Sequence, residues 1–232
     1  INSMNAEKEA LQSRLKELEE SIRGVEEGHL ISLDETCALI STYVMRVWTK
    51  IGSEVEIYNP ITWSKERIKS WNVKKLIEEP VCGNAGLIAS LEKGLLRKHK
   101  VVELEVRVIA DWDEFKRKGY HSKPVDVGRI ATLVSDRLRD AISENYYHIL
   151  VIASPTGFTR KAVEYVTGEY YKRFSSTNLT VYLLDLATGK LYYNDMDQGA
   201  VLNKYIVEPE YLAEMIDRVV NAAFHTVLEN NF

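Results

Sequence analysis

One short run of alternating charged residues could perform hydrolytic chemistry. Residues 101–109 read as a strand that places Glu103, Glu105 and Arg107 on one face and apolar residues on the other. Carboxylates on one strand face can hold Mg²⁺, and a neighbouring cation can assist the attack of water on a phosphodiester. We therefore take Glu105, Arg107 and Glu103 as candidate catalytic residues. The alternative is an exposed strand face whose charges pair with neighbouring strands.

A second candidate site is the loop that follows the apolar run 148–153. It lies between a buried strand and a helix start, where α/β proteins often bind ligands and where helix amides can hold an anion. Its candidate contacts to a nucleotide phosphate are Thr156, Gly157, Thr159 and Arg160. The loop lacks both the dinucleotide fingerprint and the P-loop pattern. The alternative is a tight connection in which Thr159 caps the next helix.

Other kinds of active site have little support in the sequence. There is no Gly-x-Ser-x-Gly elbow, and the five histidines show no paired metal-ligand spacing. Cys37 and Cys82 alone cannot form a zinc site. We expect both to be free thiols in a reducing compartment, which places the protein in the cytoplasm.

Composition is typical of a globular protein. The 232 residues are 45% hydrophobic and 28% charged, with a net charge of −4. No apolar run approaches the ~20 residues that cross a bilayer, so no membrane association is expected. Basic residues cluster in 63–75, 93–100 and 116–123, which could form a face that binds DNA phosphates, although solvated charge explains them equally well.

Residues 4–28 are predicted to form a coiled-coil helix. Apolar residues recur at spacings of four and three from Leu11 to Val25, for about three heptads. We expect this helix to make the protein a homodimer. The alternative is an amphipathic helix that packs on its own domain.

Residues 32–232 are predicted to form one α/β domain. Strands separated by single helices imply a mixed, largely parallel central sheet flanked by helices. Helices are expected at 33–51, 63–79, 124–142, 159–174 and 209–229. Strands are expected at 54–58, 101–109, 148–153 and 179–186, with a hairpin to 191–193, while 87–96 fits either a helix or a strand.

Several of these segments together resemble a known family. They are a helix leading into Gly52–Ile57, the strand with Glu105-Val106-Arg107, the strand His148–Ala153, the turn and helix Gly157–Tyr165, and Val181–Asp185. From about 35 to 195 the chain resembles the restriction-endonuclease-like fold, especially Mrr-type and archaeal PD-(D/E)xK nucleases. The resemblance implies a Mg²⁺-dependent DNA nuclease in which Glu105 is a metal ligand and Arg107 the cation.

The resembling motif is degenerate. Arginine stands where the family has lysine, and it offers a broad fork in place of a point charge. The preceding segment has no Gly-x-x-Asp pattern, and Glu92 is the candidate for the second metal-binding acid. These departures predict an active site that is altered or inactive.

Three functions follow from the sequence. The first is a Mg²⁺-dependent DNA nuclease. The second is a catalytically inactive, dimeric relative that binds DNA as a scaffold. The third is a Rossmann-like nucleotide-sensing domain, similar to the sensor domains of CRISPR-associated proteins.

Overall fold

A six-stranded mixed sheet organises the protein. The computed structural model describes residues 33–52, 55–69, 72–79, 81–118, 122–168 and 177–209. The strand order is β3-β4-β5-β6-β7-β8. The strands are β3 (Val73–Glu79), β4 (Gly83–Lys93), β5 (His99–Val108), β6 (Tyr147–Ser154), β7 (Leu179–Asp185) and β8 (Lys190–Tyr192).

The sheet combines an antiparallel and a parallel half. β3, β4 and β5 form an antiparallel meander, β5, β6 and β7 are parallel, and β8 returns antiparallel to β7. The predicted α/β class is confirmed, but the expectation of a largely parallel sheet is wrong. Short turns join β3 to β4 and β4 to β5, and such turns can connect only antiparallel neighbours.

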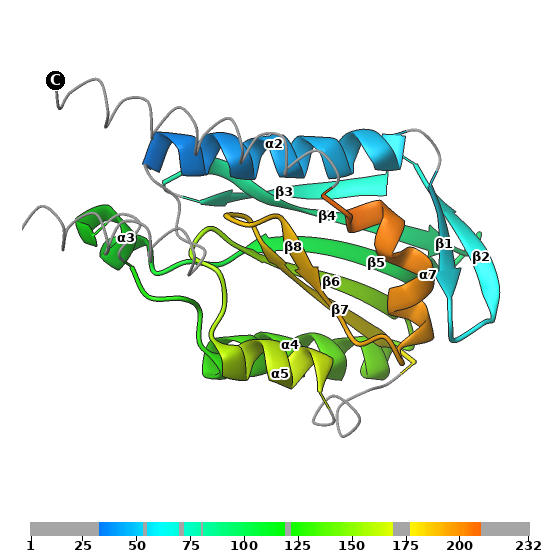
Figure 1. Ribbon diagram of the computed structural model, residues 1–232. Coiled ribbons are helices and arrows are strands. Elements are labelled where there is room, and N and C mark those ends of the chain that lie inside the picture. The colour runs from blue at the N-terminus through cyan, green and yellow to red at the C-terminus, as the bar shows by residue number, and fades with distance from the viewer. Residues whose placement is uncertain are drawn as a thin grey trace, which may run out of the picture.

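Helices cover both faces of this sheet (Figure 1). α2 (Leu33–Gly52) and α7 (Gln198–Val207) lie on one face, and α4 (Val127–Glu144) and α5 (Arg160–Thr167) lie on the other. α3 (Trp112–Lys118) follows β5, and a separate hairpin of β1 (Val55–Asn59) and β2 (Ser64–Ile68) packs beside α7. Each face therefore has its own apolar core. Residues of β6 and β7 contribute to both cores, which explains why these strands are buried along their whole length and are mostly apolar.

Side-chain caps fix where the helices on the parallel half begin. Asp126 accepts the amide of Arg129 at the start of α4, and Thr159 accepts that of Ala162 at the start of α5. Asp197 does the same for α7. The predicted role of Thr159 as a cap is confirmed.

The predicted helix over 63–79 is wrong. The structure forms β2 (Ser64–Ile68) and β3 (Val73–Glu79) within this range. The strand predicted for 54–58 is confirmed as β1, which ends at Asn59, and Pro60 begins the hairpin turn into β2. In β2, Glu66 and Ile68 point inward at a spacing of two, a pattern that the surrounding lysines and arginines obscured. The ambiguous segment 87–96 belongs largely to β4.

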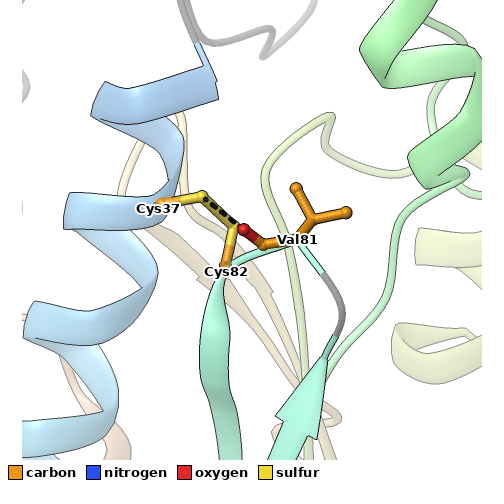
Figure 2. The surroundings of a disulfide bond; sticks show 3 residues. All are labelled: Cys37, Val81 and Cys82. Carbon is orange, nitrogen blue, oxygen red and sulfur yellow. Dashed lines mark hydrogen bonds between the residues drawn. A yellow bond between two sulfur atoms is a disulfide. The ribbon is translucent and has the colours of Figure 1, made fainter.

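Cys37 and Cys82 are joined by a disulfide between α2 and the start of β4, so the expectation of two free thiols is wrong (Figure 2). Their Cα atoms lie 5.0 Å apart although the residues are 45 positions apart in sequence. The sequence alone could not place these two elements side by side. The Cys37 Sγ also lies 3.8 Å from the carbonyl oxygen of Val81, which could accept a hydrogen bond only from a reduced thiol.

The coiled coil predicted for 4–28 and the helix predicted for 209–229 lie outside the described residues, apart from residue 209 itself. The dimer expected from the coiled coil stays a prediction. Among the described helices, none is long and apolar enough to cross a membrane.

Candidate functional site

The charged face of β5 lies under helix α4. The alternation predicted for this strand is confirmed, because Val102, Leu104, Val106 and Val108 point into the core that contains α2. Glu103, Glu105 and Arg107 therefore point to the opposite face, where α4 supplies the covering side chains.

Glu105 is buried beneath two arginines. Its side chain is 1% exposed. Arg107, two residues on, donates from Nε and Nη2 to Oε1 at 3.1 and 2.8 Å. Arg137 of α4 donates from Nε to Oε2 at 2.5 Å and from Nη2 to Oε1 at 3.1 Å. Both carboxylate oxygens are thus occupied by guanidinium donors, an arrangement that is strong because it is charged and forked.

Electrostatics keep Glu105 ionised despite its burial. Burial alone would raise the pKa of this carboxyl, but the neighbouring His148 and the donors of Arg137 and Arg107 outweigh it and hold the pKa well below its ordinary value. The arginine forks carry most of this effect, because the His148 Nε2 lies 3.4 Å from Oε2 without the alignment of a hydrogen bond. Glu105 is therefore a structural anion.

Glu103 belongs to the same group of charges. Its Oε2 accepts from the Ser90 hydroxyl at 2.7 Å and lies 2.9 Å from the Lys100 Nζ. The imidazole of His148 is fully buried between the two glutamates, with Nδ1 3.5 Å from Oε1 of Glu103. Both predicted carboxylates are consequently held in ion pairs and hydrogen bonds.

These residues do not fit a magnesium site. The expected second ligand, Glu92, pairs with Lys74 of β3 at 3.3 Å. It lies four residues along β4 from Ile88, the partner of Glu105, which is roughly 14 Å at ~3.4 Å per residue. Across the described part of the chain, no group of three or more His, Cys, Asp or Glu side chains could hold a metal ion.

The strand beside Glu105 supplies no second acid opposite the charged face of β5. The β4 residues opposite Arg107, Glu105 and Glu103 are Gly86, Ile88 and Ser90. A Cβ atom on Gly86 would lie 2.3 Å from the carbonyl oxygen of Val106, so this position cannot take any larger side chain without a backbone shift. We therefore derive no metal-dependent step from this site.

An open cleft lies between the end of β5 and the first half of α4. We call it the arginine cleft. Its volume is about 500 Å³, and its lining includes Arg107, Arg129 and Arg137 with one acid, Asp136. Asp136 is itself paired with Arg139 at 3.0 Å. Even with Glu105 beneath it, the cleft keeps a net positive charge and presents guanidinium groups to solvent. Guanidinium groups bind phosphate oxygens in pairs.

The second candidate site is packed rather than open. Thr156 is 1% exposed, and its amide and hydroxyl both contact the Ser154 hydroxyl at 3.2 Å. The backbone of Gly157 and Thr159 is bonded to Val125, which ties the loop to the segment before α4. The Arg160 side chain, by contrast, is 91% exposed and pairs with Glu164 at 2.7 Å. The structure therefore does not gather Thr156 and Arg160 on one surface.

The sequence analysis missed the cleft residues of α4. Arg129, Leu133 and Arg137 follow each other at intervals of four, so they share one helix face beside the buried Ile130 and Val134. This spacing was visible in the sequence. What could not be seen was that this face lies over Glu105, which is 32 residues from Arg137.

Comparisons with protein-family models, with curated proteins and with solved structures find no match to this chain.

Proposed function

We propose that this chain is a catalytically silent relative of restriction-endonuclease-like nucleases whose arginine cleft binds the phosphate backbone of DNA. The order of elements supports the resemblance. After α2 and the β1-β2 hairpin comes the meander that ends in the Glu105 strand. Helices α3 and α4 follow, and then the parallel strands β6 and β7 with α5 between them, in the order of the resembling segments.

One observation carries the proposal. Arg107 and Arg137 occupy both oxygens of the buried Glu105, so the group that a nuclease would use to hold a metal is neutralised from within the protein. The same arginines line an open cleft, and their side chains are 28% and 24% exposed. The arrangement suits an anion arriving from outside better than a cation.

Arg129 is the cleft residue best suited to contact DNA. Its side chain is exposed and donates one bond to the carbonyl of Ala110, which fixes its position at the mouth of the cleft. It has no ion-pair partner among the described residues, so its charge is available to a phosphate. Arg107 and Arg137 would add to the positive electrostatic potential of the cleft while they remain paired with Glu105.

The test is binding of a fluorescent 20-base-pair duplex, followed by anisotropy, with Mg²⁺ or Mn²⁺ present and the fragment length read on a gel. We expect binding without cleavage, and at least tenfold weaker binding for Arg129→Glu. Arg139→Glu is the matched control, because it reverses the same charge on the same helix outside the cleft lining. Metal-dependent cleavage, or equal losses in both variants, would overturn the proposal.

A further inference from the structure

The turn between β4 and β5 exposes two neighbouring leucines. Leu95 and Leu96 are 99% and 100% exposed. The turn depends on Gly94, whose φ is +114° and whose Cβ, if present, would lie 2.3 Å from the carbonyl oxygen of Arg97. The tight backbone leaves both leucine side chains projecting from the end of the sheet without an apolar neighbour.

Cations surround these leucines. The run from Lys93 to Lys100 contains no acidic residue. Lys93 pairs with Glu66 of β2 at 2.7 Å, whereas Arg97 and Lys98 have no ion pair or side-chain hydrogen bond in the described part of the chain. Two apolar side chains and two available positive charges therefore occupy the same tip.

A third exposed apolar residue lies on the neighbouring hairpin. Trp63, in the turn between β1 and β2, is 73% exposed. The Lys93–Glu66 ion pair joins the base of the leucine turn to β2, three residues from Trp63. We call the turn 94–98 together with Trp63 the leucine tip. Tryptophan favours the boundary between lipid headgroups and acyl chains.

We propose that the leucine tip docks on the surface of an anionic lipid bilayer. Leu95 and Leu96 would enter the boundary between headgroups and acyl chains, while Arg97 and Lys98 would contact lipid phosphates. This is a surface contact and involves no membrane-spanning segment. It is independent of the arginine cleft, because the tip precedes β5 and Arg107 lies near the far end of that strand.

A bilayer fits the tip better than a nucleic acid does. Two adjacent aliphatic side chains gain contacts in DNA only by wedging open stacked bases, which costs free energy. A headgroup boundary accepts the same side chains without such a cost, and anionic lipids match the two available cations.

The test is sedimentation of the full chain with vesicles of 30% phosphatidylserine in phosphatidylcholine. We expect binding to these vesicles, at least tenfold weaker binding to pure phosphatidylcholine, and at least tenfold weaker binding for the Leu95→Ser/Leu96→Ser double variant. Val201→Ser/Leu202→Ser is the matched control, because it removes two exposed apolar residues from α7, outside the tip. Brominated lipids should quench tryptophan fluorescence in the bound protein, and less so in Trp63→Phe.

Several results would overturn the proposal. They are no binding to anionic vesicles, equal binding by the leucine and control variants, or quenching that does not depend on Trp63. A shift from dimer to monomer in Leu95→Ser/Leu96→Ser without a change in vesicle binding would assign the tip to a second copy of the chain. Loss of duplex DNA binding without loss of vesicle binding would assign it to a nucleic acid.

Discussion

Arg137 and Glu105 form a forked ion pair that joins helix α4 to strand β5 across 32 residues of sequence. Arg107 adds a second fork to the same carboxylate. Because the acid is 1% exposed, neither arginine can be exchanged for water without leaving a charge buried. The pair therefore organises the floor of the arginine cleft.

Removing the charge of Glu105 should destabilise the fold. Glu105→Gln leaves Arg107 and Arg137 without their shared counter-ion, and breaking a buried pair costs about 3–5 kcal/mol. Urea unfolding at pH 7 should show this loss in the free energy of unfolding. Glu164→Gln, which removes the acid of the exposed Arg160–Glu164 pair, should cost less than about 1 kcal/mol. Equal losses in the free energy of unfolding for the two substitutions would show that the ion pairs of Glu105 stabilise the fold no more than an exposed pair does.

The same carboxylate should make the protein sensitive to acid. The pKa of Glu105 is lowered in the folded protein because the neighbouring His148 and the hydrogen bonds and charges of Arg137 and Arg107 outweigh its burial. The unfolded chain thus binds its proton at higher pH, so stability is present above about pH 4.5 and is lost as the pH falls further. Unfolding curves between pH 3 and 6 should be flatter for Glu105→Gln. A wild-type slope that persists unchanged in the variant would assign the acid sensitivity to other groups.

Asp185 should give stability the opposite dependence on pH. Burial at the end of β7 raises its pKa from 3.8 to about 6, although the amides of Ala187 and Thr188 partly offset that effect. The folded protein holds this proton to higher pH than the unfolded chain, so stability should fall by up to ~3 kcal/mol as the pH rises from 4 to 7. Asp185→Asn keeps an oxygen for both amides and should be more stable than wild type at pH 7 but not at pH 4. The prediction fails if the variant is less stable at both.

The disulfide should stabilise the protein strongly. Closing a loop of 45 residues removes unfolded-state entropy equivalent to about 4 kcal/mol. Dithiothreitol should lower the Tm of the wild type and leave that of Cys37→Ser/Cys82→Ser unchanged. A wild-type Tm that does not respond to the reductant, together with two titratable thiols in the native protein, would contradict the pairing.

Local sequence patterns predicted the strands that are buried on both faces and the helix that has a regular apolar stripe. The strands 148–153 and 179–186 are mostly apolar, and the helix after Pro124 has a regular stripe with a capping acid, so each was found near its true position. The strand β1 was predicted, but its partner β2 was missed because long basic side chains on the exposed positions of β2 masked the two-residue period. α3 and α7 were missed because both are short, at 7 and 10 residues.

The candidate site shows a different limit. The alternation of β5 correctly placed both glutamates on one face. Whether that face opened to solvent depended on α4, which follows β5 by a long connection. No local pattern could reveal that Arg137 reaches Glu105, or that Cys37 meets Cys82, since each contact depends on how distant elements pack.

The salt dependence of duplex binding tests the central claim most directly. Each arginine that contacts a phosphate releases counter-ions, so removing one contact lowers the slope of log K against log salt concentration by about 1. We predict a salt-dependent wild type, a slope smaller by about 1 for Arg129→Ala, and an unchanged slope for Arg139→Ala. An Arg129→Ala slope equal to that of the wild type, or no DNA binding by the wild type even at low salt, would contradict the account.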